Sequence, residues 1–215
     1  MKMILKLGVV VSALGLTTPL SAEMAKLTVN KHNIKVWTIQ DPQNPILSYR
    51  AETTLNTTLQ RAVAVVLDVE NARSWVPNVA STEILSQDPN HGDFKLYMVL
   101  DFPFPLKDRD LIVQGKMYKD AKGLIYIKNK SGTTGKALQP NLVRIHQYVG
   151  DWVFEALGPN KVKVTTSGYA NPEGVIPQSV TNLFVQQQPY QMLKKMQSEV
   201  QKPRAAAFKL PEILK

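Results

Sequence analysis

The chain of 215 residues contains no cysteine. This absence excludes disulfide scaffolds, cysteine-based zinc sites, thiol nucleophiles and iron–sulfur clusters. The sequence also lacks short repeats, which excludes collagen-like and low-complexity classes, and no longer period indicates a solenoid. Charged residues make up 20% of the chain and hydrophobic residues 44%. One globular domain with its own core is therefore expected.

Signatures of catalysis are missing as well. The loop Gly132–Lys136 has two residues between its glycines and is followed by Ala137, whereas a phosphate-binding loop needs four residues there and Ser or Thr after the lysine. Neither Gly-x-Ser-x-Gly nor Ser-x-x-Lys occurs. His32, His91 and His146 form no short metal-ligand motif. We therefore expect no catalytic residue, no metal and no cofactor.

Basic residues outnumber acidic ones, 26 to 17, which gives a formal net charge of +9. Such an excess favours anionic partners, namely nucleic acid or phospholipid headgroups. Whether nucleic acid or phospholipid is the partner depends on where the protein resides, and the N-terminal sequence is informative about location.

The first 22 residues have the three regions of a secretory signal peptide. Residues 1–6 are basic, residues 7–16 are apolar apart from Ser12, and residues 17–22 are small and turn-prone. The apolar run is shorter than the roughly 20 residues of a transmembrane helix. We expect cleavage after Ala22 and a periplasmic protein without nucleic-acid partners. An uncleaved anchor helix or a buried N-terminal helix is the alternative.

Strand patterns dominate the middle of the chain and are separated by short turns. The expected strands cover residues 27–40, 46–54, 82–86, 94–101, 109–118, 123–129, 142–156 and 161–168. Successive hairpins predict an antiparallel meander, and no helical pattern between these later strands supports a parallel sheet.

Two helices frame these strands. Apolar residues at helical spacing predict a first helix from Leu59 to about Asp68, with Asn56 and Thr57 as possible caps. A long last helix is expected over residues 178–201, kinked by its internal proline. The domain thus spans residues 23–202, and residues 203–215 form a loosely ordered basic tail.

These elements predict an α+β fold in which a curved antiparallel sheet wraps around the long C-terminal helix. Such a sheet leaves a space between itself and the helix, and an apolar cavity of about 300–1,000 Å³ would suit a small apolar ligand. Tyr97, Trp152, Phe154 and Phe184 are the candidate lining residues.

Four segments, in this order, resemble the START lipid-transfer domain of the helix-grip superfamily. They are SWVP at 74–77, FPFPLKDRDLIV at 102–113, GDWVF at 150–154 and NPEGVIP at 171–177. The resemblance covers about residues 30–200 and implies a helix-grip fold with a lipid-sized internal tunnel.

The resemblance also implies a lid, formed by the last helix and the loop that carries Phe102 and Phe104. The chain departs from the family pattern at Asn171, where an aspartate is usual, and at Glu173, where a glycine is usual. Sterol-carrying members have a second arginine at the position of Gly115. Their buried charge pair is not carried over, so the resemblance does not extend to sterol as the ligand.

Several candidate site residues have two interpretations. Arg109 could clamp a ligand headgroup or form a structural ion pair that ties the start of its strand to a neighbouring loop. His146 could contact the ligand or act as a general base, or it could face solvent. Tyr148, Trp152 and Phe154, which share one strand face if no bulge intervenes, could line the pocket or belong to the core. The tail, residues 203–215, could meet anionic lipid or be solvated.

We expect an exported, non-catalytic protein that binds or carries a lipid or another hydrophobic small molecule. Its lid would open at a membrane surface, where the apolar loop tips enter the interface while Lys107 and the basic tail meet headgroups. The alternative is an enzyme that resembles the polyketide cyclases and aromatases of the same superfamily. A third possibility is an interaction module whose cavity is filled by its own side chains.

Overall fold

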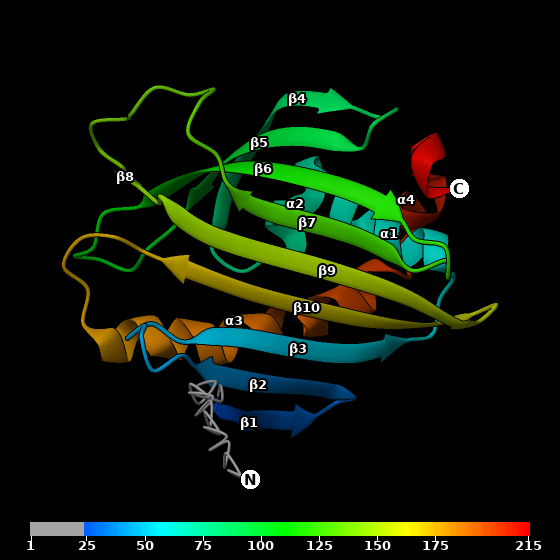
Figure 1. The fold of residues 1–215 in the computed structure, drawn as a ribbon, viewed down its shortest axis with the longest axis horizontal. Coiled ribbons are helices and arrows are strands. Elements are labelled where there is room, and N and C mark those ends of the chain that lie inside the picture. Colours follow the sequence, from blue (N-terminus) through cyan, green and yellow to red (C-terminus); the bar gives the residue numbers. More distant parts are fainter. Residues whose placement is uncertain (1–23) are drawn as a thin grey trace, which may run out of the picture.

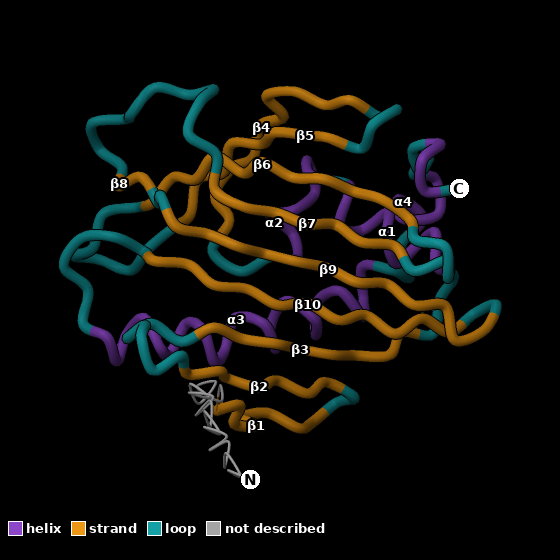
Figure 2. Tube along the Cα trace, in the orientation of Figure 1, coloured by secondary structure: helices purple, strands orange, loops and turns teal. Residues whose placement is uncertain are grey.

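The structure is a computed structural model that describes residues 24–215. The predicted signal peptide, residues 1–22, lies outside the described residues. One curved sheet of ten strands forms most of the described chain, and the helices cover one of its faces (Figures 1 and 2).

The sheet is antiparallel apart from one short pair. Its strands are β1 (Met24–Lys31), β2 (Ile34–Gln40), β3 (Ser48–Leu55), β4 (Val79–Asp88), β5 (Asp93–Leu100), β6 (Arg109–Lys119), β7 (Ile125–Ser131), β8 (Val143–Arg144), β9 (Gln147–Gly158) and β10 (Lys161–Asn171). The order across the sheet is β1-β2-β3-β10-β9-β7-β6-β5-β4, and β8 pairs in parallel with β6. β10 therefore lies between β3 and β9, where it joins two groups of strands.

The side chains of β10 show why the sheet has one buried face. Val162, Val164 and Thr166 are buried, whereas Lys161 is exposed and Lys163 is partly exposed. Because successive side chains of a strand point to opposite faces, the apolar set faces the helices and the lysines face solvent. The alternation in the sequence therefore fixes which face the helices cover.

The helices all lie behind the sheet in Figure 1. They are α1 (Leu59–Leu67), the 3₁₀ helix η1 (Val69–Asn71), α2 (Ala72–Trp75), α3 (Gln178–Glu199), α4 (Pro203–Ala207) and the 3₁₀ helix η2 (Glu212–Leu214). The N-cap of α1 is Thr58, whose hydroxyl accepts a hydrogen bond from the Arg61 amide at 3.3 Å. The expectation of Asn56 or Thr57 as the cap is one to two residues too early.

The main core lies where α1, α2 and the C-terminal half of α3 meet the sheet. Phe154 on β9 and Leu193 on α3 are fully buried. The Trp152 ring stacks on Phe154 with ring centroids 6.2 Å apart, and Trp75 of α2 meets it edge-on at 5.9 Å.

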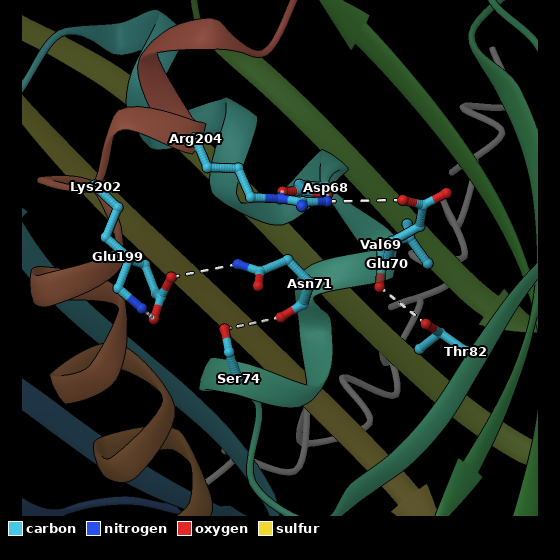
Figure 3. Close-up of polar contacts among 9 residues, drawn as sticks. All are labelled: Asp68, Val69, Glu70, Asn71, Ser74, Thr82, Glu199, Lys202 and Arg204. Atoms are coloured by element: carbon cyan, nitrogen blue, oxygen red, sulfur yellow. Dashed lines mark hydrogen bonds and ion pairs between the residues drawn. The ribbon is translucent and has the colours of Figure 1, made fainter.

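The C-terminal segment is held against α1 rather than loosely ordered. The Arg204 guanidinium donates to Asp68 at the end of α1, with Nη2 and Oδ1 2.7 Å apart (Figure 3). The buried carboxylate of Glu199 pairs with Lys202 Nζ at 2.6 Å. Leu214 is buried in the same core. The expectation of a loose tail overlooked the Arg204–Asp68 pair, because these two residues lie far apart in the sequence.

The predicted α+β helix-grip architecture is confirmed, with one further difference. Residues 142–156 form two strands rather than one: β8 crosses to pair with β6, and β9 starts at Gln147. An ion pair between Arg144 and Asp110 holds β8 on β6. Among residues 24–215, no helix is both long and apolar enough to cross a membrane.

Candidate ligand-binding site

A cavity of about 200 Å³ lies between the sheet and the N-terminal half of α3. Strands β3, β5, β6, β9 and β10 supply its wall, and α3 supplies its cover. Apolar side chains dominate the lining, among them Met98, Leu111, Ile145, Val185 and Met192. The cavity exists on this side because α1 and α2 cover only the other part of the sheet face. It is smaller than the expected 300–1,000 Å³.

Two predicted residues, Phe102 and Phe184, line this cavity. Phe102 lies in the connection between β5 and β6, and Phe184 lies on α3. Their ring centroids are 5.4 Å apart. This contact joins the connection to the helix at one end of the cavity.

Trp152 and Phe154 do not line the cavity, although both were predicted to do so. They lie on the same face of β9 as Tyr148, which does line it. The cavity is nearer the start of β9, however, and α1 and α2 cover the strand from Gly150 onward. Both residues therefore belong to the main core.

Tyr97 lies on the opposite face of the sheet from the cavity. Its neighbour Met98 lines the cavity, and side chains alternate along β5. The Tyr97 hydroxyl donates to Asp110 Oδ2 at 2.9 Å, and Arg144 donates to both oxygens of that carboxylate at 2.8 Å. Burial and the hydrogen bond to Asp110 raise the pKa of Tyr97 to about 12. The expectation that Tyr97 lines the cavity is therefore wrong: the next residue on β5, Met98, points toward the cavity instead.

The Asp110–Arg144 pair also shifts the titration of the carboxyl group. Burial raises the pKa of Asp110, but the hydrogen bonds from Arg144 and Tyr97 together outweigh that effect, so the pKa is lowered. The side chains of both partners are almost fully buried. The pair fastens the segment around β8 over the outer face of β6.

Arg109 uses its donors on backbone carbonyl groups. Its Nε donates to the Pro172 carbonyl at 3.1 Å, Nη2 to that of Glu173 at 3.2 Å, and Nη1 to that of Lys107. Its guanidinium also lies 4.4 Å from the centroid of the Phe102 ring. Arg109 therefore ties the start of β6 to the loop that leads into α3, as its second interpretation predicts, although its partners are carbonyls rather than carboxylates.

Phe104 and His146 are exposed and lie outside the cavity. Phe104 is 96% exposed at the tip of the β5–β6 connection. His146 lies in an open groove with Leu138, Pro140 and Glu173. The solvent-facing interpretation of His146 agrees with this position.

Tyr49 on β3 and Tyr148 on β9 both line the cavity. Sequence reasoning offered Tyr148 as possible lining but missed Tyr49. Two glycines, Gly150 and Gly168, lie opposite each other on β9 and β10. A glycine pair inside otherwise apolar strands is a signal of close packing, and it could have pointed to this part of the wall.

The remaining polar groups of the wall are neutral. Gln188 on α3 donates to Asn78 Oδ1 at 3.2 Å, so these two side chains bind each other. Within residues 24–215, His, Asp and Glu side chains form no group of three that could hold a metal ion. The cavity is thus built to surround an apolar molecule.

Gly115 lies on β6 where its missing side chain leaves room for the Phe94 ring. A Cβ there would lie 2.0 Å from Cζ of Phe94. An arginine at this position would therefore displace Phe94, which agrees with the absence of the second arginine of sterol-carrying members.

Comparison with known proteins gives a consistent result. The family model described as START domain matches residues 23–206. An uncharacterized protein of Pseudomonas aeruginosa, PA1579, is 26% identical over 203 residues, which cover 94% of this chain and all of that protein. The mouse mitochondrial StAR-related lipid transfer protein 7 is 20% identical over 195 residues; the match covers 88% of this chain and 52% of that protein.

Solved structures show the same fold. A STAR-related lipid transfer protein from Xanthomonas axonopodis, solved as fragment 25–204, has a TM-score of 0.76 and 26% identity, over 83% of this chain and 99% of that one. Human STARD10 has a TM-score of 0.73 and 21% identity, over 83% of this chain and 74% of that one. With the family model matching most of its length, the chain belongs to the START domain family.

Proposed function

We propose that this protein binds a lipid or a similar apolar molecule in the cavity under α3 and carries it without chemical change. The observation that carries the proposal is a mainly apolar, partly open cavity at the sheet–helix interface of a START domain. Pockets of this kind bind small apolar ligands. Relatives named as lipid transfer proteins share the fold.

Carriage rather than catalysis suits the chemistry of the lining. General acid–base catalysis needs a titratable group near its operating pH, within hydrogen-bond reach of the substrate. The titratable groups on this wall are tyrosines, and burial raises the pKa values of Tyr49 and Tyr148 further above 10. Both hydroxyls stay protonated near neutral pH, which favours binding over proton abstraction.

A ligand larger than about 200 Å³ requires the cover to move outward. The contact between Phe102 and Phe184 and the carbonyl bonds of Arg109 are the links that hold α3 and its preceding loop to the β5–β6 connection. We therefore place the opening at this end, with α3 and the connection acting as the lid.

The same end carries apolar side chains that no packing explains. Phe104 is 96% exposed, Val175 97% and Leu138 71%. They lie on three loops that Arg109 and Glu173 bring together, at the left of Figure 1. We propose that these tips enter a membrane interface while the lid opens, with Lys107 beside them for anionic headgroups.

The basic tail does not share this end, contrary to our expectation. Lys215 accepts a bond from Lys119 at the end of β6, whereas Arg109 begins that strand. Eleven residues of extended strand separate the two by about 30 Å. Headgroup contact by the tail would therefore need a separate part of the membrane surface from the one that the tips enter.

Export remains part of the proposal. The arrangement of residues 1–22 supports removal of a signal peptide and a periplasmic location.

Mass spectrometry of the purified protein under native conditions tests the proposed function. The wild type should retain a co-purifying lipid. Phe184→Asp should lose it, because an unpaired charge on the cavity wall is costly. Leu157→Asp is the matched control, since Leu157 is 48% exposed at the far end of β9 and should retain the lipid. Retention by a folded Phe184→Asp variant would contradict the assignment.

A further inference from the structure

Two tyrosines lie on either side of one strand in the cavity wall. Tyr49 on β3 pairs with Gly168 on β10, and Gly168 pairs with Gly150 on β9. Tyr148 is two residues before Gly150 on the same face of β9. The three paired positions across β3, β10 and β9 are therefore Tyr49, Gly168 and Gly150. Two of these three positions have no side chain.

The glycines make room for the two phenol rings. A Cβ on Gly168 would lie 2.6 Å from Cε1 of Tyr49, and a Cβ on Gly150 would lie 2.0 Å from the Tyr148 hydroxyl oxygen. Each ring therefore lies against the backbone of a glycine. Since Cβ positions of paired residues are about 5 Å apart, the two hydroxyl oxygens are within about 10 Å of each other.

Both side chains line the cavity. The Tyr148 hydroxyl has no hydrogen-bond partner among the described residues, whereas the Tyr49 hydroxyl lies beside the side chain of Thr166 on β10. Tyr169 differs, because its side chain alternates with Gly168 and so points to the outer face of the sheet, where its hydroxyl donates to Gln147 Oε1 at 3.3 Å. Burial raises the pKa values of Tyr49 and Tyr148, so both keep their protons as donors.

We propose that Tyr49 and Tyr148 form a polar subsite that binds an uncharged oxygen-bearing group of the ligand, a hydroxyl or a carbonyl. This inference rests on the proposed function of the cavity. The subsite offers two hydroxyl groups in an otherwise mainly apolar wall. A charged headgroup would find no opposite charge on this wall, and burying it unpaired is costly. The ligand class is therefore a neutral, singly polar lipid, such as a long-chain alcohol or ester.

Displacement of the neutral fluorophore N-phenyl-1-naphthylamine tests this inference with three competitors of equal chain length: octan-1-ol, octane and octanoate. Tyr148→Phe and Tyr49→Phe keep the ring that fills the space and remove only the hydroxyl. Each should weaken octan-1-ol by about 2- to 10-fold, as expected for one lost hydrogen bond. Octane should bind the variants and the wild type equally well.

Tyr169→Phe is the control and should leave both affinities unchanged, because its hydroxyl lies on the outer face of the sheet, bonded to Gln147. The inference is overturned if octan-1-ol binds both subsite variants as it binds the wild type, or if octane weakens by the same factor. Tighter binding of octanoate than of octan-1-ol would also overturn it. If the fluorophore and octane both fail to bind the wild type, the proposed function itself fails.

Discussion

Phe102 and Phe104 are two residues apart in one loop, yet the structure gives them opposite environments. Phe104 is 96% exposed, so replacing it with serine removes almost no burial. Phe102 is half-buried between the Phe184 ring and the Arg109 guanidinium. We expect Phe104→Ser to weaken membrane binding at unchanged stability, and Phe102→Ser to lower stability.

The magnitudes follow from burial. Removing a fully buried phenylalanine costs about 3–5 kcal/mol, so the half-buried Phe102 should cost about 2 kcal/mol, or about 4–8 °C in Tm for a chain of this size. Phe104→Ser should stay within about 0.5 kcal/mol of the wild type. If the Phe104 ring is buried in the membrane interface, its loss costs about 2 kcal/mol. That corresponds to about 30-fold weaker vesicle binding.

Thermal unfolding and co-sedimentation with vesicles of phosphatidylethanolamine and phosphatidylglycerol measure the two quantities. The reasoning is refuted if Phe104→Ser lowers Tm as much as Phe102→Ser does, because the loop tip would then be packed. Vesicle binding of Phe104→Ser at the wild-type level would refute the membrane contact alone.

Three further predictions concern packing, pH and export. Gly150→Ala should lower stability by about 1–3 kcal/mol and weaken fluorophore binding, because its Cβ would lie 2.0 Å from the Tyr148 hydroxyl; Gly158→Ala, with no atom within 4 Å, should do neither. The folded protein lowers the pKa of the Asp110 carboxyl group. The stability that the ionised carboxylate contributes is therefore present above about pH 4 and is lost as the pH falls through the pKa of the folded state. Urea unfolding at pH 7 and pH 3 should therefore show a smaller loss for Asp110→Asn than for the wild type. N-terminal sequencing of the fractionated protein should show that residues 1–22 are absent; an intact N-terminus in the membrane fraction would contradict export.

Much of the fold could be predicted because its signals are local. Alternation along β10 and helical spacing in α1 appear within single elements. The placement of β8 and of the C-terminal segment could not be predicted in this way. Both depend on ion pairs between distant residues, Arg144 with Asp110 and Arg204 with Asp68.

The site was harder to predict than the fold. Aromatic residues on strands were assigned to the cavity by type, but their roles depend on which face of a strand they occupy and on which part of the sheet the helices cover. Tyr97 lies on the face of its strand away from the cavity, and Trp152 lies on the part of the sheet that the helices cover. Tyr148 shares a strand face with Trp152, and only the position of α1 and α2 separates their roles.

The position of β10 between β3 and β9 has a consequence for how the chain acquires its structure. Strands β1–β3 and β4–β9 are made first, but they share no edge until residues 161–171 arrive. Pairings that span so much sequence form slowly, because the intervening chain must close as a large loop. The helix that covers the cavity follows β10 directly. The cavity wall thus stays uncovered until the end of the chain folds, so a hydrophobic molecule can be enclosed in the same step that completes folding.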